Sequence, residues 1–319
     1  DMLGAKTTAY IEGDFTGSTN ATINNLRLRH AYIDMNWEHH RLLAGQYWYA
    51  MVIHEIMPMT NPLNMGAPFH CYARQPQVRY EFRHSGFEAV AVAQWQLDNM
   101  SQGLLNGVVT SSTLFARNSL VPELTAQLRY RHGALFVGAA VNAKTIRPVV
   151  NTIGVSSYGQ LYTSLTYSLF GSLTLKGVTF KAQTLLNNSL YEGCSLGGYA
   201  ILYDPLSPSS CLGPSYYFKD WYFNTVWFDV ERNTGHWRPG LFLGYAWKVD
   251  GFNASNYTSF DITYLGRGHE LDYLWRIQPR LTYTTLTGLS FTGEAEYTYA
   301  GYDTPVGNLR LSLSITYAF

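Results

Sequence analysis

The chain has 319 residues, and its 22 Lys and Arg residues equal its 22 Asp and Glu residues in number. Charged residues make up 14% of the sequence and aromatic residues 15%, whereas soluble domains are usually about 25% charged. This composition gives no bulk positive charge for a nucleic-acid partner and argues against an ordinary soluble domain, although a large aromatic-rich soluble β-protein is the alternative.

No apolar run reaches the ~18 residues that a membrane-spanning helix requires, and the mean hydropathy is only −0.11. Few charges and many aromatics without a long apolar run are typical of transmembrane β-strands, because alternation dilutes their hydrophobicity. The chain begins at Asp1 without a signal peptide and enters a strand pattern at once, which is typical of a processed or incomplete chain.

Fourteen segments alternate apolar and polar residues, and each has about the 11 residues that a tilted strand needs to cross a bilayer. The last one is the clearest, because its odd-numbered residues from Leu309 to Phe319 are apolar while the even-numbered residues between them are mostly polar. We expect a bulge near residues 30–34, and Pro279 requires an edge or a bulge. The expected strands are residues 4–15, 24–36, 40–50, 75–84, 87–98, 120–132, 134–147, 158–170, 172–186, 216–231, 237–249, 270–284, 289–300 and 308–319.

Short and long connections alternate along the chain. The long ones include residues 51–74, 99–119, 148–157, 187–215 and 250–269, the last with a possible short strand at 259–265. Short turns at one rim and long loops at the other are typical of an outer-membrane barrel, and lipid burial requires the sheet to close. We therefore predict one domain, residues 1–319, that is an all-β transmembrane antiparallel up-and-down β-barrel of 14 strands in the bacterial outer membrane, with the lipid bilayer as its surroundings. The short connections are residues 37–39, 85–86, 133, 171, 232–236 and 285–288.

The polar faces of these strands carry charges of both signs, which would line a wet lumen and select solutes by charge. We expect an anion-attracting constriction near Arg29, Arg79, Lys181 and Arg276. The alternative is that the charges cancel in pairs and merely solvate the inside of the barrel. The predicted pore-lining residues are Arg27, Arg29, Arg79, Arg83, Arg129, Lys181, Arg276, Arg280, Glu12, Glu81, Asp272 and Glu294.

Loop 51–74 is long enough to fold inward and narrow the pore, which we favour over an outward cap or a clasp onto a neighbouring subunit. Small residues recur at predicted lipid-facing positions, where they would permit subunit packing or simply fill the strands. Both interpretations of these small residues are open. They are Ala89, Ala91, Ala93, Ala139 and Ala143.

Cys194 and Cys211 fall in one predicted external loop, where an oxidising compartment would permit a disulfide between them. Cys71 is left over, and three free thiols are the alternative. Residues 193–197 read G-C-S-L-G and match a hydrolase pattern around Ser195. That pattern requires a strand, a turn and then a helix, and no helix is expected here, so we attribute the match to chance. The sequence shows no catalytic, metal or cofactor motif beyond this.

Six segments in the first quarter of the chain resemble one porin family. They are Leu3 to Thr7 (LGAKT), Ile11 to Phe15 (IEGDF), Leu26 to Tyr32 (LRLRHAY), Leu42 to Trp48 (LLAGQYW), Gly66 to Phe69 (GAPF) and Gln75 to Arg79 (QPQVR). Together they resemble the DcaP-like porins, especially those of the Bacteroidetes. The resemblance implies a trimeric, sixteen-stranded outer-membrane channel for small, often anionic solutes.

Members of this family usually carry an additional hairpin before the segment that matches Leu3 to Thr7. The barrel therefore either closes with 14 strands or has 16 strands with its first hairpin missing from this chain, and we favour the missing hairpin. We expect a porin that passes small hydrophilic, anionic solutes by passive diffusion, a homotrimer, and not an enzyme. The alternatives are a lipase-like or protease-like barrel enzyme, a fourteen-stranded transporter of hydrophobic solutes, and a plugged structural or secretion-associated barrel.

Overall fold

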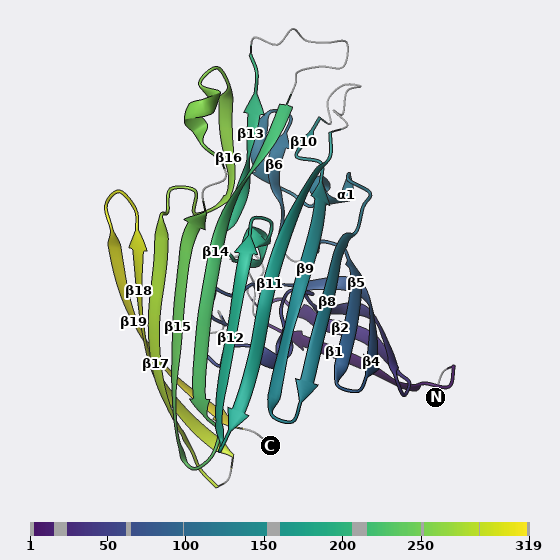
Figure 1. Cartoon of the computed structure of the whole chain (residues 1–319), viewed down its shortest axis with the longest axis vertical. Helices are drawn as coiled ribbons and strands as arrows, with labels where there is room; N and C mark the ends of the chain where they lie inside the picture. Colours follow the sequence, from purple (N-terminus) through teal and green to yellow (C-terminus); the bar gives the residue numbers. More distant parts are fainter. Residues whose placement is uncertain are drawn as a thin grey trace.

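The computed structural model describes residues 3–15, 24–61, 65–97, 99–151, 160–205, 216–249, 252–286 and 288–317. Its main feature is a 16-stranded antiparallel sheet, in which β13 and β16 lie off the main path. Along that path each strand pairs with the next one in chain order, which confirms the predicted all-β up-and-down topology (Figure 1). The strands of the path are β1 (Lys6–Asp14), β2 (Arg27–Asn36), β3 (His40–Trp48), β4 (Arg74–His84), β5 (Phe87–Gln94), β8 (Glu123–His132), β9 (Leu135–Ile146), β11 (Tyr162–Leu175), β12 (Val178–Asn187), β14 (Tyr216–Arg232), β15 (Trp237–Val249), β17 (Tyr273–Thr284), β18 (Leu289–Gly301) and β19 (Val306–Tyr317).

Several connections that the sequence predicts as loops contain structure of their own. β13 (Gly197–Tyr203) pairs with the far end of β14 and with β16 (Asp261–Arg267), and these strands rise above the main sheet in Figure 1. A small second sheet contains β6 (Gln102–Leu105), β7 (Val108–Ser111) and β10 (Val149–Val150). The short helices are η1 (His54–Ile56), α1 (Leu114–Arg117), η2 (Leu190–Gly193) and η3 (Ala254–Tyr257). Within the described ranges, none of the helices has the length and apolar character needed to span a membrane.

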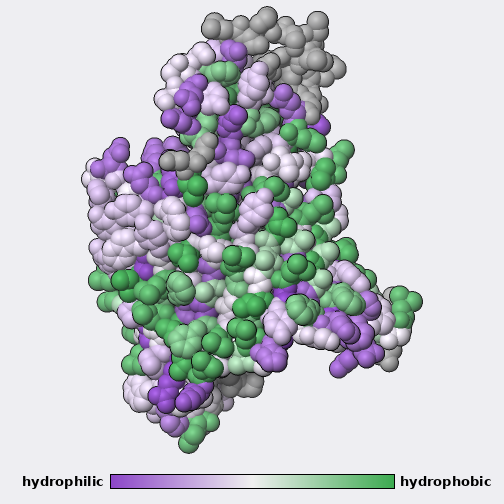
Figure 2. All heavy atoms as spheres, viewed as in Figure 1, coloured by the Kyte–Doolittle hydropathy of each residue, from purple (hydrophilic) through white to green (hydrophobic). Residues whose placement is uncertain are grey.

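The two faces of the sheet differ in polarity as strand alternation requires. On β19, Leu311 and Leu313 are 74% and 90% exposed on the outer face. On β17, Arg276 lies on the inner face and is only 7% exposed. Hydrophobic residues gather across the middle of the outer surface, and hydrophilic ones gather toward its ends (Figure 2). On β19 the leucines therefore point away from the interior, and on β17 the guanidinium group of Arg276 points into it.

The turn between β11 and β12 differs from the sequence prediction. The sequence predicts a hinge at Gly171, but β11 continues to Leu175 and the chain reverses at Lys176 and Gly177. These two residues have φ of 47° and 78°, the left-handed pair that a two-residue hairpin turn favours. Gly171 lies mid-strand, where a Cβ atom would be 2.9 Å from the Phe136 carbonyl oxygen. Close approach to the neighbouring strand thus explains this glycine.

Two smaller irregularities also depart from the expected positions. The register between β1 and β2 shifts so that Arg29 is the extra residue, just before the predicted bulge at residues 30–34. Pro279 lies in an interior strand, opposite Leu241 of β15, and not at an edge or a bulge. The β17–β18 ladder has no pair at Pro279 and keeps its register across that gap, so the missing N–H interrupts one ladder only.

The sheet has two edges among the described residues. β1 pairs only with β2, and β19 pairs only with β18, so the described pairings do not close the sheet. Fourteen strands in antiparallel succession make β1 and β19 antiparallel to each other. A closed barrel would accordingly need either a direct contact between them or an even number of strands in between.

The largest apolar core lies inside the curved sheet and not between two layers. Met51, Ile53 and Phe69, from the connection between β3 and β4, have no exposed surface. They belong to one cluster with Trp227 of β14 and Phe242 of β15. The interior of the sheet is therefore partly filled by this connection.

Candidate functional site

The described part of the connection between β3 and β4 folds inward, and we call its residues 49–61 and 65–73 the inward loop. Its position is fixed by hydrogen bonds and an ion pair to five different strands, so it crosses the interior from one wall to the other. These are Arg129 Nη1 to Glu55 Oε1 (3.0 Å), Lys181 Nζ to the Met57 carbonyl (2.8 Å), the Met59 N–H to Asp229 Oδ2 (3.1 Å), the Asn61 N–H to Glu294 Oε2 (3.0 Å) and Arg276 Nη1 to the Ala67 carbonyl (2.7 Å).

The apolar side of the inward loop packs on the aromatic inner face of β14 and β15. The ring centroids of Phe69 and Phe242 are 6.1 Å apart, and those of His70 and Trp227 are 5.8 Å apart. His70 is fully buried, and neither ring nitrogen has a hydrogen-bond partner among the described residues. Burial disfavours the charged imidazolium and lowers the pKa of His70 to about 4. The loop is thus held by packing as well as by polar contacts.

Near β1, the inward charges form a compact group of ion pairs. Arg27 contacts Asp14 at 2.7 Å, and Arg29 contacts both Glu12 at 2.7 Å and Asp14 at 3.1 Å. All four side chains are partly exposed, so the pairs remain in contact with water. The positive charge that the sequence predicts at this wall is therefore matched by acids from the adjacent strand.

A second group is centred on Glu81 of β4, which is 2% exposed. Its carboxylate accepts from Arg79 at 2.6 Å, from Arg41 at 3.2 Å and from Arg83. On β8, which is separated from β4 by β5, Arg129 is 5% exposed and directs its guanidinium group toward Glu55 of the inward loop. Arg41 also contacts Asp34 at 2.8 Å, so three arginines face two carboxylates and the group keeps an excess of one positive charge.

A third group lies on β14, β17 and β18, and it contains more acids. Arg280 contacts Asp229 at 2.7 Å and Glu231 at 2.7 Å, and Arg276 contacts Glu296 at 3.4 Å. Glu294 accepts from Gln278 at 2.7 Å and from the inward loop. Across the interior from the Glu81 group, this wall is the more acidic one.

The structure places all the predicted pore-lining residues on the inner face except one. Asp272 precedes β17, which begins at Tyr273, and its side chain is exposed while Leu271 is buried. The alternation that assigns Asp272 to the lumen does not extend past the start of the strand. Sequence reasoning missed Asp229, because Trp221, Phe223 and Trp227 give the inner face of β14 a largely aromatic pattern. Buried and exposed residues alternate along β14, and the exposed Phe228 next to Asp229 is the signal that could have placed Asp229 on the inner face.

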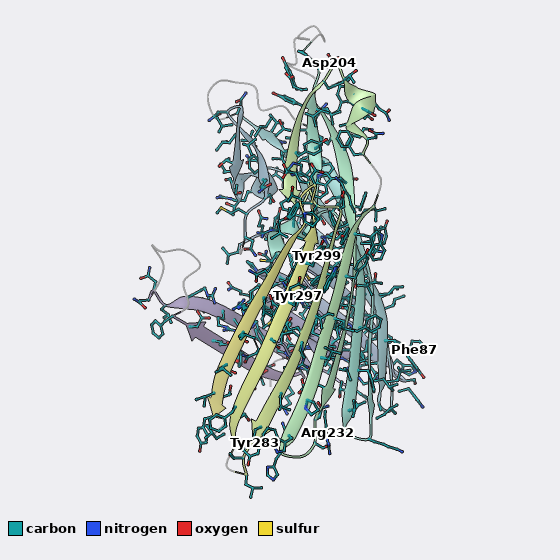
Figure 3. All side chains as sticks on the ribbon, turned by 90° about the vertical axis from the view of Figure 1, so that its left-hand side faces the viewer. Phe87, Asp204, Arg232, Tyr283, Tyr297 and Tyr299 are labelled. Atoms are coloured by element: carbon teal, nitrogen blue, oxygen red, sulfur yellow. The ribbon has the colours of Figure 1, made fainter. Side chains whose placement is uncertain are left out.

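The outer face carries aromatic rings in contact with one another at two levels. Near the long-loop end, Trp275 lies 5.4 Å from Tyr297 and 5.6 Å from Tyr299. Near the short turns, where Figure 3 shows Tyr283, the ring centroids of Tyr283 and Trp237 are 4.7 Å apart. Trp275 and Tyr283 are eight residues apart on β17, or about 26 Å along the strand at ~3.3 Å per residue, and less in height once the strand tilts. Aromatic girdles at both borders of an apolar band about 25 Å tall are typical of transmembrane barrels.

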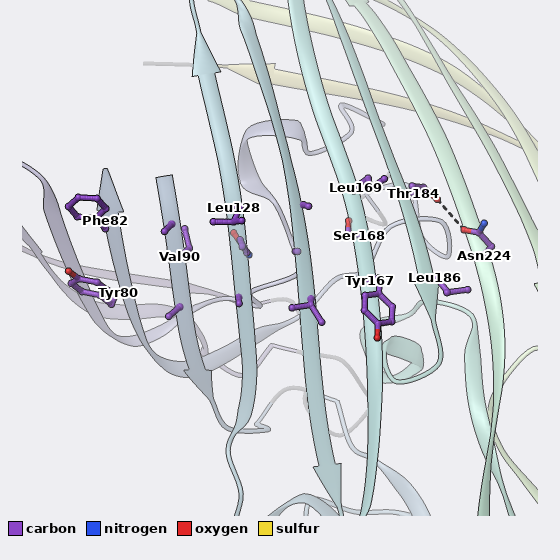
Figure 4. A pocket seen from close by; sticks show the side chains of 17 residues that line it. Tyr80, Phe82, Val90, Leu128, Tyr167, Ser168, Leu169, Thr184, Leu186 and Asn224 are labelled. Carbon is purple, nitrogen blue, oxygen red and sulfur yellow. Dashed lines mark hydrogen bonds between the residues drawn. The ribbon is translucent and has the colours of Figure 1, made fainter. Parts of the chain in front are cut away.

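A shallow hollow of about 870 Å³ interrupts this outer face. Ala89, Ala91 and Ala139 line it together with Ala126, and larger side chains such as Leu128 surround them (Figure 4). Small residues therefore line a recess in the wall at these positions.

The remaining sequence motifs give no second site. Cys211 lies outside the described residues, so the Cys194–Cys211 pairing stays a prediction. Ser195 is buried between η2 and β13, and its Oγ atom has no hydrogen-bond partner among the described residues. A helical turn before the serine and a strand after it is the reverse of the order that a nucleophile elbow requires.

Comparison with known proteins finds similarity in structure only. No protein-family model matches the chain, and no curated protein matches it. The outer membrane channel DcaP of Acinetobacter baumannii is similar in structure, with a TM-score of 0.73 over 100% of this chain and 82% of that chain, at 18% sequence identity.

Two further solved structures resemble the chain less closely. An anion-selective porin from Comamonas acidovorans has a TM-score of 0.55 at 10% identity, over 98% of this chain and 80% of that one. A loop-deletion mutant of OmpT, an outer membrane protein of Vibrio cholerae, has a TM-score of 0.54 at 8% identity, over 98% and 85%. The chain thus has the fold of outer-membrane channels and porins.

Proposed function

We propose that the chain is an outer-membrane porin through which small hydrophilic solutes diffuse passively. The observation that carries this proposal is the opposite polarity of the two faces of the sheet. The outer face is apolar and bordered by two aromatic levels, and the inner face holds charged groups that need water. The inward loop then narrows the path, and no covalent chemistry is required.

The proposed location is the bacterial outer membrane, with the apolar band in lipid and the whole chain as one barrel domain. Three of the structures that resemble the chain are outer-membrane proteins or porins, which supports this location. The similarity of the first-quarter segments to Bacteroidetes members of the DcaP-like family supports the same placement from the sequence alone.

Selectivity for anions is the finer part of the proposal. It is supported by the excess of arginine around Glu81 and by the ammonium of Lys181, which contacts a carbonyl and no carboxylate within 4.0 Å among the described residues. Arg29 and Arg276 are both paired with acids, which reduces the preference. We therefore expect a weak anion preference. The porin from Comamonas acidovorans is anion-selective, and that property belongs to that protein.

Closure of the barrel is proposed to involve two further strands. Lipid-facing strand edges would leave unpaired N–H and C=O groups in hydrocarbon, so the edges at β1 and β19 must be paired in a membrane. One hairpin between them keeps the alternation antiparallel and brings the path to 16 strands. A homotrimer is proposed as well, with the hollow around Ala89 and Ala139 as a recess in the outer wall where subunits could pack.

An enzyme is the competing function. The only hydrolase pattern in the sequence surrounds Ser195, whose surroundings have the wrong order of elements. We propose that the chain is not an enzyme. Hydrolysis of a lipid or peptide ester by the purified protein, lost on Ser195→Ala, would contradict this.

The test is single-channel recording in a planar bilayer, with the reversal potential measured under a salt gradient. A porin gives discrete, long-lived current steps, and a weak anion preference gives a small reversal potential of the corresponding sign. Protein heated until its sheet structure is lost serves as the control. Bilayers that stay silent with folded protein would refute the porin function, whereas a cation-selective current would refute only the anion preference.

A further inference from the structure

A backbone hydrogen bond joins the inward loop to the connection between β12 and β14. The Tyr72 N–H donates a 2.7 Å hydrogen bond to the Gly193 carbonyl. A Cβ atom built on Gly193 would lie 3.6 Å from the Cβ atom of Cys71. The residue before Cys194 therefore lies next to Cys71, although the two belong to different long connections.

The backbone geometry brings the two cysteines to about the distance that a disulfide requires. Standard peptide dimensions on either side of the Tyr72–Gly193 bond give an upper bound of about 8 Å between the Cα atoms of Cys71 and Cys194. Cα atoms in disulfides are separated by at most roughly 7 Å. At most a small backbone shift is needed to join them.

The environments of the two thiols differ in a way that suits stepwise oxidation. Cys71 is fully buried, and burial raises the pKa of its thiol above the ordinary value, with further contributions from the charges of Glu123 and Cys194. Cys194 is partly exposed, and its N–H donates to the Tyr191 carbonyl at 3.2 Å at the end of η2. Both thiols are unbonded in the structure. An oxidant would therefore reach Cys194 first.

We propose that Cys71 and Cys194 form a disulfide that joins the inward loop to the segment between η2 and β13. The sequence alone predicts a Cys194–Cys211 pairing and leaves Cys71 without a partner. The two pairings exclude each other, because both use Cys194. The bond would hold the loop at its C-terminal end, opposite the anchors at Met57 and Met59. The constriction would then be fixed covalently on one side and by hydrogen bonds on the other.

The oxidation needs an external protein disulfide of the thiol-oxidase class. The Cys194 thiolate attacks one sulfur of that disulfide, which forms a mixed disulfide and releases one oxidant thiolate. The Cys71 thiolate then attacks the Cys194 sulfur and releases the second oxidant thiolate. Two protein thiols thus lose two protons and two electrons, and the oxidant becomes a dithiol. This inference depends on the proposed outer-membrane location in one respect, which is that the cysteines must lie in an oxidising compartment.

The test identifies the linked cysteines directly. Purified protein in detergent is incubated with a glutathione redox couple, its remaining thiols are alkylated, and it is digested with a protease that cleaves before aspartate. Cleavage before Asp204 separates Cys194 from Cys211, so mass spectrometry distinguishes the two pairings. We expect a linked Cys71–Cys194 peptide pair that disappears on reduction.

Variants serve as matched controls. Cys211→Ser should keep the link, and Cys194→Ser should abolish it. A Cys194–Cys211 linked peptide in the unmodified protein, or alkylation of all three thiols after oxidation, would overturn the proposal. The readout does not depend on channel activity, so a silent channel with the link present would refute the porin function and leave this inference standing.

Discussion

Asp229 joins the barrel wall to the inward loop, and its replacement by asparagine tests how the constriction is held. The carboxylate accepts from Arg280 at 2.7 and 3.1 Å and from the Met59 N–H at 3.1 Å, and both charged side chains are at most 2% exposed. Asp229→Asn keeps the shape and removes the charge. In either orientation of the asparagine amide, its NH₂ group would face a donor: Nη1 of Arg280 in one orientation, and both Nη2 of Arg280 and the Met59 N–H in the other.

The expected cost follows from the burial of this pair. Removing one partner of a buried ion pair costs about 3–5 kcal/mol. Glu231 remains 2.7 Å from Arg280 and offsets part of the loss, so we expect about 2–3 kcal/mol. At ~2–4 °C per kcal/mol, the melting temperature should fall by about 4–12 °C.

The assay is thermal unfolding in detergent, followed by circular dichroism at one scan rate, together with single-channel recording. We expect the lower melting temperature and noisier current steps, because the loop loses its anchor at Met59. Asp272→Asn is the matched control, since Asp272 is exposed and lies outside the strands. Equal melting temperatures and equal current noise for both variants would show that Asp229 does not hold the loop.

Three further predictions concern the loop, the pore charge and the outer strands. Burial lowers the pKa of His70 from 6.5 to about 4, so the unfolded protein binds a proton at this residue more readily than the folded protein does. The contribution of His70 to the free energy of unfolding is therefore complete above pH 6.5 and falls by up to about 3 kcal/mol as the pH drops to 4. His70→Gln should remove this part of the pH dependence of the urea midpoint, and an unchanged dependence would contradict the assignment. Lys181→Glu should move the reversal potential toward cation preference, and no movement would mean that this ammonium does not face the solute path. Gly198→Ala would place a Cβ atom 2.1 Å from the Leu265 carbonyl oxygen and should weaken the β13–β16 pairing by at least ~1–3 kcal/mol. Hydrogen exchange in β16 should rise accordingly, whereas Gly293→Ala, with its nearest contact at 3.5 Å, should leave exchange unchanged.

The strands were predictable where one face is apolar and the other polar. β19 and β17 show this alternation, and the structure has them close to the predicted bounds. β13 was not predictable in this way, because most of its residues are buried on both faces and its sequence does not alternate. Gly171 misled the turn assignment, since a glycine required by close strand packing reads like a turn glycine in the sequence.

The site was predictable only in part. Alternation identified which charges face inward, because it depends on local geometry alone. It could not show that Arg29 pairs with Glu12 or that Arg280 pairs with Asp229, since those contacts depend on strand register. The inward course of the loop depends on hydrogen bonds from distant strands, such as that of Lys181 to the Met57 carbonyl, and these have no local signature.

The central claim is that one face of this sheet lies in hydrocarbon and the other in water. Spin labels placed one at a time along β19, from residue 309 to residue 314, test it in liposomes through their accessibility to oxygen and to a water-soluble nickel complex. We predict oxygen maxima at Leu309, Leu311 and Leu313 and nickel maxima at Ser312 and Ser314, with a period of two residues. Nickel accessibility at Leu311 and Leu313 equal to that at the serines would contradict the account.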